Sequence, residues 1–298
     1  MKTKIKTSMG RKVFLAADVV TVVVLSVLCM IPLLNLLAIS FSSFQAIIEN
    51  KVTLFPVDFT LNAYEYVVQS RKFWTSVRVS LLRVLLGVPV NVLMTILAAY
   101  PLSKDPNQFR ARRFYVAYMM IVMLFNGGLM PTYYVVAKTG LIDSVWSLVL
   151  PGAVPVFSCI VLLNFFRGIP SELEESAKLD GAGQWTILTK IYLPLSKPSI
   201  AMVTLFSLVN HWNSYFDGLI YSNRTQNYPL QSYLQTIVVS TTDLIKNGDI
   251  DALMKLTNIN DINMRAAQVF ISVVPLMAVY PFLQKYVTTG LVLGSVKG

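Results

Sequence analysis

The chain has 298 residues, of which 55% are hydrophobic and only 13% charged, and its mean hydropathy is +0.60. A soluble domain carries about 25% charged residues, so this composition leaves too much apolar surface for one soluble core. The net charge of +10 does not indicate nucleic-acid binding, because the basic residues flank apolar runs instead of forming one basic face. An integral membrane protein is predicted.

Six apolar runs are long enough to cross the hydrocarbon layer, which takes about 20 residues of helix. Lipid cannot satisfy backbone hydrogen bonds, and the length of the runs favours helices over barrel strands. No linker divides the chain, so we predict a single all-α transmembrane domain over residues 1–298. The expected helices, in chain order, cover residues 14–40, 76–102, 114–136, 145–166, 199–220 and 268–286.

The first run follows basic residues, as in a secretory signal, but it is too long and lacks a small-residue cleavage pattern. We therefore expect an uncleaved first helix. If the N-terminus is cytoplasmic, 15 of the 25 Lys and Arg residues fall in inner segments and 8 in outer segments. The positive-inside rule then places both termini of this multi-pass protein in the cytoplasm.

A charged segment, residues 167–198, separates the fourth and fifth expected helices and would face the cytoplasm. Pro170 interrupts helical backbone, Ser171 is a good N-cap, and Glu174 stands in the capping-box position three residues later. A short helix is expected to follow, over residues 172–179.

Gly181 permits a backbone conformation that other residues resist, so the chain is expected to turn there. A second helix over residues 182–192 should end at Pro194. Two short amphipathic helices joined at a glycine predict a compact knob on the cytoplasmic face. The alternative is an interfacial hairpin that lies on the lipid and binds nothing.

The knob resembles the EAA loop, the signature of permease subunits in bacterial ABC importers. The match is carried by the spacing of Glu175, Ala177, Gly181, Ile191, Leu193 and Pro194, and Ser176 stands where a second alanine is common. The resemblance implies that the knob docks into a cleft on a cytoplasmic ATPase, with Glu175 making a charged contact. The ATPase-coupling residues expected on this basis are Glu175, Ser176, Ala177, Asp180, Gly181, Ala182, Ile191, Leu193, Pro194 and Lys297.

The resemblance extends to residues 125–133, 211–217 and 290–298, which are similar to maltose-type carbohydrate permeases. Within that family they look like the subgroup for oligosaccharides from complex polysaccharides, of the alginate or rhamnogalacturonan type. A short C-terminal tail reaches the ATPase interface in a maltose-type relative, which is the basis for including Lys297.

The resemblance implies the transmembrane permease subunit of an ATP-driven, binding-protein-dependent oligosaccharide importer in the bacterial cytoplasmic membrane. Its expected partners are a second permease subunit in a heterodimeric pore, two cytoplasmic ATPase subunits, an extracytoplasmic sugar-binding protein and membrane lipid. This chain would not be an enzyme and would bind no cofactor, because ATP and Mg²⁺ would sit on the ATPase. A neutral malto-oligosaccharide is the alternative substrate to a uronate-containing one.

Polar side chains inside the membrane suggest where substrate passes, because such groups are costly in lipid and usually face a cavity or a partner helix. In the fifth expected helix, Asn210, Asn213 and Asp217 fall at i, i+3 and i+7, on one stripe. Arg83 and Asn126, in the second and third helices, lie at a similar depth.

We predict a sugar-binding cavity at this depth, in which Asn210 and Asn213 bind hydroxyl groups. Trp212 or Tyr215 would stack on a sugar ring, and Arg83 would meet an acidic sugar. The alternative is that these groups tie helices together or extend to the surface. Residues Gly127, Gly128 and Pro131 either break the third helix at a binding site or permit close packing.

Other classes of function fit the sequence poorly. An ion-driven secondary transporter should carry mid-membrane carboxylates and inverted repeats, but Asp18 and Asp217 lie near helix ends. His211 is the single histidine, so a packed or interhelical role is expected for it, and neither a catalytic triad nor a metal site is. Cys29 and Cys159, both in predicted membrane helices, support no disulfide framework. The sequence has no phosphate-cradling glycine loop, so the chain is not expected to hydrolyse ATP.

Overall fold

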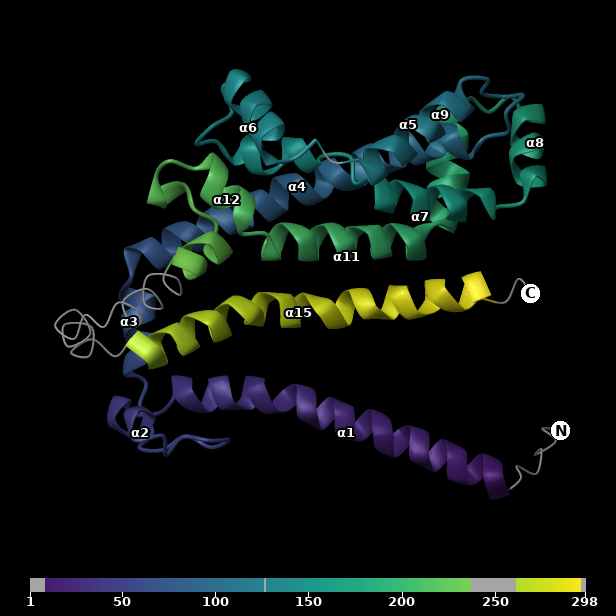
Figure 1. Ribbon diagram of the computed structural model, residues 1–298. Helices are drawn as coiled ribbons and strands as arrows, with labels where there is room; N and C mark the ends of the chain where they lie inside the picture. The colour runs from purple at the N-terminus through teal and green to yellow at the C-terminus, as the bar shows by residue number, and fades with distance from the viewer. Residues whose placement is uncertain (1–8, 126, 237–260, 296–298) are drawn as a thin grey trace. The chain divides into compact units, whose positions relative to one another are not determined.

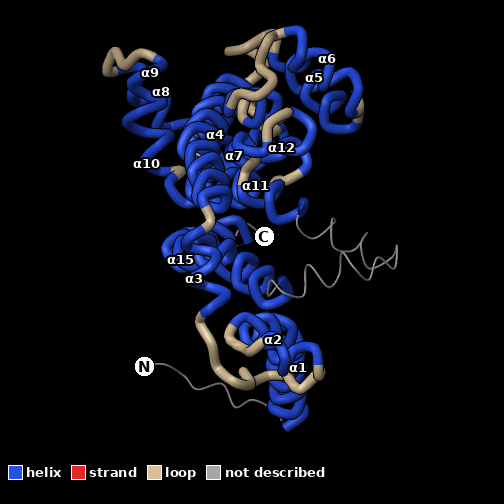
Figure 2. Tube along the Cα trace, turned by 90° about the vertical axis from the view of Figure 1, so that its left-hand side faces the viewer, coloured by secondary structure: helices blue, strands red, loops and turns tan. Residues whose placement is uncertain are grey.

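The computed structural model describes residues 9–125, 127–236 and 261–295. In these parts the chain is helical and contains no strand, and short loops join the helices (Figure 2). The all-α fold class is therefore confirmed. The chain forms two compact units, residues 1–70 with 240–271 and residues 71–239 with 272–298.

The first unit contains α1 (Met9–Ser40), α2 (Phe44–Ile48), α3 (Asn62–Gln69) and the beginning of α15 (Asp261–Ser295). Apolar side chains cover α1 on all sides, and nearly all of them are exposed within this chain. A helix of this kind needs lipid or another protein around it. At its end the Ser42 hydroxyl accepts a hydrogen bond from the Val57 amide, and the Ser42 carbonyl accepts one from the Asn263 side chain.

The second unit is built around α4 (Arg71–Ser103), against which α7 (Val156–Arg167) and α11 (Lys197–Asn213) pack (Figure 1). The buried stripe of α4 recurs every three or four residues, which is the helical period. Its small members let neighbouring helices approach closely, as membrane helices require. The stripe consists of Phe73, Ser76, Ser80, Arg83, Gly87, Asn91, Thr95, Ala99 and Leu102.

Two predicted membrane helices are divided by breaks in the middle. Residues 114–136 are split between α5 (Arg112–Leu124) and α6 (Leu129–Lys138), which are bent by 113°. Gly128 has φ of +87° at this break, a conformation that favours glycine. Of the two expectations for the glycine pair, the structure shows the helix break. Residues 199–220 are likewise split, because α11 ends at Asn213 and α12 (Phe216–Tyr221) follows.

The fourth predicted helix, residues 145–166, begins as two 3-10 turns, η1 (Val145–Leu148) and η2 (Leu150–Gly152), before α7. Pro151 and Pro155 lie where a continuous α-helix would need their missing N–H groups. After α12 come the turn η4 (Thr225–Asn227) and a helical stretch over residues 230–236. Within the described residues, three helices are long and apolar enough to cross a membrane, or up to six if each bent pair is one span.

Candidate functional site

The predicted knob is present as two short helical pieces joined by a turn. The first is α8 (Ser171–Leu179), and the second runs through α9 (Gln184–Ile187), the π-helical segment η3 (Leu188–Tyr192) and α10 (Leu193–Leu195). Figures 1 and 2 both show α8 and α9 together beside one end of α4. The knob is thus attached directly to the helices that would cross the membrane.

Two details of the knob differ from the sequence prediction. The capping box is wrong, because α8 already begins at Ser171, no side chain caps it, and Glu174 points to other partners. The second helix does not end at Pro194 but continues to Leu195, followed by an 82° bend into α11. Pro194 therefore lies within the continued helix, at the start of its α10 part.

The turn between the two pieces depends on Gly181, whose φ is +80°. The Ala182 amide donates to the Ala177 carbonyl at 2.8 Å, and the Gly181 amide donates to the Lys178 carbonyl at 3.0 Å. These two bonds, with a left-handed residue between them, are the Schellman motif that ends many helices. The predicted role of Gly181 in the turn is therefore confirmed.

The expected coupling residues divide into an exposed and a packed set. Glu175, Ser176, Asp180, Gly181 and Pro194 are exposed, whereas Ala177, Ala182, Ile191 and Leu193 are half-buried against the core of α4, α7 and α11. Lys297 lies outside the described residues.

Sequence reasoning missed two large apolar side chains on the knob surface. Leu179 is 89% exposed immediately before the turn, and Trp185 is 68% exposed just after it. Their position beside an Asp-Gly turn was a signal available in the sequence. Exposed side chains of this size next to a charged surface are typical of protein interfaces.

Glu174 is a buried charge of this region, with 6% of its surface exposed. Its Oε2 lies 2.6 Å from Lys104 Nζ and accepts a hydrogen bond from the Tyr192 hydroxyl at 2.7 Å. Lys178 Nζ lies 2.7 Å from the other carboxylate oxygen, Oε1. Burial alone would raise the pKa of Glu174, but hydrogen bonds from Lys104, Lys178 and Tyr192 outweigh it and lower the pKa to about 2.

Aromatic rings enclose this ion pair. Tyr100, Phe166 and Tyr192 pack edge to face in pairs with centroid distances of 5.1 to 6.4 Å. Lys104 Nζ lies 4.1 Å from the centre of the Tyr100 ring and 4.2 Å from that of Tyr192, within the range of cation–π attraction. Burial lowers the pKa of Lys104, and the carboxylate of Glu174 opposes this effect.

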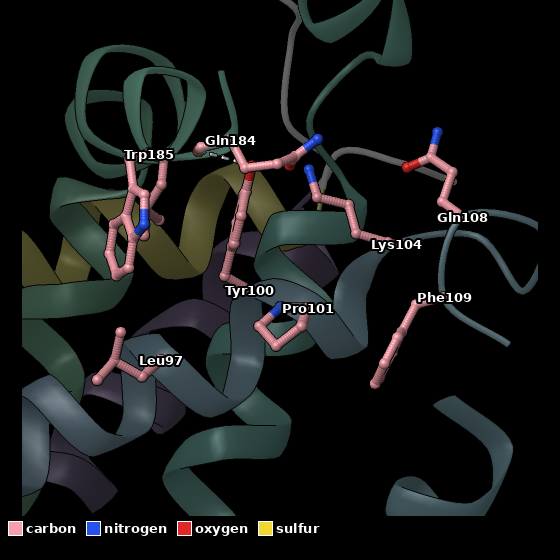
Figure 3. Close-up of a pocket in the computed structure, with 9 residues that line it drawn as sticks. Leu97, Tyr100, Pro101, Lys104, Gln108, Phe109, Gln184 and Trp185 are labelled. Atoms are coloured by element: carbon pink, nitrogen blue, oxygen red, sulfur yellow. Dashed lines mark hydrogen bonds between the residues drawn. The ribbon is translucent and has the colours of Figure 1, made fainter. Parts of the chain in front are cut away.

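A pocket of about 420 Å³ opens beside the ion pair, between the end of α4 and α9 (Figure 3). Within it the Tyr100 hydroxyl donates to Gln184 Oε1 at 2.8 Å, which links α4 to the start of α9. Trp185 lies next to Gln184, and Phe109 lies on the far side of Lys104. The Ser103 end of α4 is therefore joined to both pieces of the knob.

A second polar cluster lies deep among α4, α11 and α12. Arg83 is 2% exposed, and its Nη1 donates to Asp217 Oδ1 at 3.0 Å and to the Ser214 carbonyl at 3.2 Å. Its Nη2 pairs with Asp217 Oδ2. The arginine is therefore engaged by two carboxylate oxygens and one carbonyl, and the pair ties α4 to the segment where α11 breaks.

His211 continues this cluster along α4. Arg83 Nε donates to His211 Nδ1 at 3.3 Å, so the proton of the neutral ring is on Nε2, which donates to Asn91 Oδ1. Asn91 Oδ1 also accepts from Ser207 at 2.9 Å, while its Nδ2 donates to the Gly152 carbonyl at 2.6 Å. The interhelical role expected for His211 is confirmed.

The predicted substrate-path residues fall into two groups. Asn210, Asn213 and Tyr215 are exposed, while Trp212 is buried and its indole N–H donates to the Ser272 carbonyl at 2.9 Å. Because the helix breaks at Ser214, Asp217 does not continue the stripe of the two asparagines as predicted. Asn126 lies outside the described residues.

No protein-family model matches the chain. The chain is similar to the polygalacturonan/rhamnogalacturonan transport system permease protein YtcP of Bacillus subtilis (strain 168), with 36% identity over 273 residues. That alignment covers 92% of this chain and 94% of YtcP. Protein LplC of the same organism is 38% identical over 268 residues, covering 90% of this chain and 89% of LplC.

Among solved structures, the chain is similar to one in a bacterial ABC transporter involved in the import of the acidic polysaccharide alginate. The TM-score is 0.84 with 29% identity, and the match covers 95% of this chain and 99% of that chain. A second structure, of a bacterial alginate ABC transporter in complex with an alginate pentasaccharide-bound periplasmic protein, matches with a TM-score of 0.58 and 16% identity and shows the fold alone.

The helical fold, its long apolar helices and the knob at their end are typical of a membrane transport subunit. The chain belongs to the permease subunits of binding-protein-dependent ABC importers for sugars. Proteins of this family are integral to the inner membrane, and partner ATPases hydrolyse the ATP. A second permease subunit completes the transport unit.

Proposed function

We propose that the chain forms half of a pore that imports an oligosaccharide containing uronic acids. The observation that carries this proposal is the similarity over most of the chain to YtcP and to the alginate transporter chain. Polygalacturonan, rhamnogalacturonan and alginate are all polymers with uronic acid units. An extracytoplasmic binding protein would deliver the sugar, and ATP and Mg²⁺ would bind to the partner ATPases and not to this chain.

The proposal places both termini in the cytoplasm. Its support is the excess of Lys and Arg in the inner segments. In this orientation the knob, residues 171–195, lies on the cytoplasmic side, where the ATPases are. The break between α11 and α12 then lies toward the outer surface.

The knob is the proposed contact with the ATPase. Glu175, Ser176, Asp180 and Gly181 form an exposed charged and polar surface, and Leu179 adds an apolar side chain beside it. The half-buried residues Ala177, Ala182, Ile191 and Leu193, together with the exposed Pro194, hold this surface on the helical core. Lys297 belongs to the proposed contact through the resemblance of the tail.

Asn210 and Asn213 are the proposed hydroxyl-binding groups of the path, with Tyr215 as the stacking ring. All three are exposed on α11 or directly after it, in a region whose polar groups are costly unless they face water or a partner. Arg83, Asp217 and Trp212 already contact protein groups, so we assign them to shaping the path behind these residues. Asn126 is retained from the sequence prediction.

Uptake by the complete complex tests the proposed substrate. The chain, its partner permease, the ATPases and the binding protein would be reconstituted in proteoliposomes and supplied with labelled oligosaccharides. We expect ATP-dependent uptake of uronate-containing oligosaccharides and little of malto-oligosaccharides, and a reduction in uptake for Asn213→Ala in a complex that assembles normally. Uptake of malto-oligosaccharides alone would contradict the proposed substrate, and unchanged uptake by Asn213→Ala would remove it from the path.

A further inference from the structure

We infer that Glu174 is a positioning residue for energy coupling, which fastens the knob to the inner end of α4 through Lys104 and Tyr192. A movement of the knob then reaches α4 directly, and not only through the chain connections of α8 to α7 and of α10 to α11. The inference rests on the proposed function, in which the knob receives movement from the ATPase.

The connection joins segments that are distant along the chain. Lys104 directly follows the last residue of α4, Ser103, whereas Glu174 lies in the middle of α8, 70 residues later. Peptide bonds link α8 to its neighbours α7 and α9, but α4 has no such link to the knob. Non-covalent contacts at this point are therefore the direct connection between the knob and α4.

The contacts have the geometry of a rigid joint. Both oxygens of Glu174 are engaged, Oε2 by Lys104 and Tyr192 and Oε1 by Lys178. The Lys104 amine lies within cation–π range of both the Tyr100 and the Tyr192 ring, and the Tyr100 hydroxyl adds a bond to Gln184. An exposed ion pair contributes little stability. Removing one member of a buried pair is costly, because the other charge is then left unpaired away from water.

The neighbouring residue of α8 shows the contrast. Glu175 is exposed and makes no ion pair within the described part of the chain, so it is available to a partner protein. Glu174 is turned inward and forms ion pairs with Lys104 and Lys178 of its own chain. Two adjacent carboxylates thus have separate tasks, one toward the partner and one toward α4.

Farther along α4, toward its N-terminal end, buried polar contacts also join this helix to its neighbours. Arg83 and Asn91, on the buried stripe of α4, contact α12 through Asp217 and α11 through His211. Buried polar contacts therefore hold α4 at its inner end to the knob and farther along to the proposed substrate path. Because Arg83 and Asn91 lie on α4 and Lys104 directly follows it, a displacement at Lys104 can move along this helix to its contacts with α11 and α12.

The inference is tested by measuring sugar transported per ATP hydrolysed in the reconstituted full complex. We expect Glu174→Gln and Lys104→Met each to lower this ratio about tenfold, the range typical of coupling between sites, while ATP hydrolysis continues. Exchange of the two charges in Lys104→Glu with Glu174→Lys should recover part of the ratio. The matched control is Glu172→Gln, an exposed acid at the start of α8, which should keep the ratio of the unmodified protein.

A cross-link separates positioning from a simple role in folding. In a Cys29→Ser background, Lys104→Cys with Glu174→Cys would be treated with a bifunctional thiol reagent of matching length. We expect the untreated protein to be uncoupled and the cross-linked protein to regain transport. Cross-linked protein that stays uncoupled, or Glu174→Gln that couples as Glu172→Gln does, would overturn the inference. Absence of ATP-driven uptake by the unmodified complex would instead contradict the proposed function.

Discussion

Individual side chains in this protein take their roles from burial more than from charge. Glu174 and Glu175 are adjacent and chemically identical, yet one is enclosed by Lys104, Lys178 and Tyr192 and the other faces outward. The sequence shows two adjacent glutamates but does not distinguish the buried one from the exposed one, because Lys104, the partner of Glu174, follows a different helix, α4. The capping-box pattern assigned Glu174 a local role, and the tertiary ion pair replaced it.

The pH dependence of stability should reveal the ion pair of Glu174. The pKa of this carboxyl group is lowered from 4.5 to about 2, so its charged form stabilises the fold above about pH 4.5. This contribution should be lost as pH falls from there toward 2. The measurement is the thermal midpoint of detergent-solubilised protein and of Glu174→Gln between pH 3 and 7. The difference between them should be constant from pH 7 to 5.5 and should shrink only below that range; a difference that shrinks already between pH 7 and 5.5 would contradict the assignment.

Gly87 shows how closely helices approach around the buried cluster. A Cβ at this position would lie 2.5 Å from His211 Nε2, so even alanine must displace the ring and break its bond to Asn91. We expect Gly87→Ala to cost about 1 to 3 kcal/mol of stability, as overpacking in a core does. Thermal unfolding measures this cost. The control Gly152→Ala meets no atom within 4 Å and should unfold near the normal temperature. Equal stability of the two variants would refute the packing argument.

At the scale of elements, the local signals of the sequence identified the knob and the turn, while long-range contacts decided its details. Pro170, Gly181 and the apolar spacing were sufficient to predict α8 and the turn after it. The π-helical segment Leu188–Tyr192 was not predictable, because it brings Tyr192 toward Glu174 and packs Leu188 into the core beside α4. The breaks near Gly128 and Ser214 also differ in predictability, since glycine marks the first and no comparable residue marks the second.

Gly181→Ala isolates the contribution of the turn to coupling. A Cβ at Gly181 would meet no atom within 4 Å, so the whole cost comes from its φ of +80°, about 1 kcal/mol for a residue with a side chain. We expect a distorted turn and lower ATP-driven uptake. Gly183→Ala is the matched control, because its φ of −74° suits any residue and it too has open space. Equal ATP-driven uptake by the two variants would contradict the claim that coupling requires the left-handed conformation at Gly181.

At the scale of the whole molecule, the composition predicted an all-helical membrane protein, and the EAA spacing pointed to its family. The polar residues inside the membrane were the least predictable part. Arg83, Asn91, Ser207, His211 and Asp217 form one network, although they come from α4, α11 and α12, and α4 is far from the other two along the sequence. The sequence could show only that they were costly in lipid. Which of them face a path and which face one another depends on how α4, α11 and α12 pack.

We propose that energy enters through the exposed surface of the knob, apart from the groups that contact substrate. The most direct test of this proposal is ATP-driven uptake by the reconstituted complex carrying Glu175→Arg. Reversing an exposed charge should leave the membrane helices intact and abolish uptake, whereas the same change at the exposed Glu65 of α3 should not. The predicted result is that Glu175→Arg loses uptake and that the Glu65 variant keeps it. Normal uptake by Glu175→Arg would contradict the account.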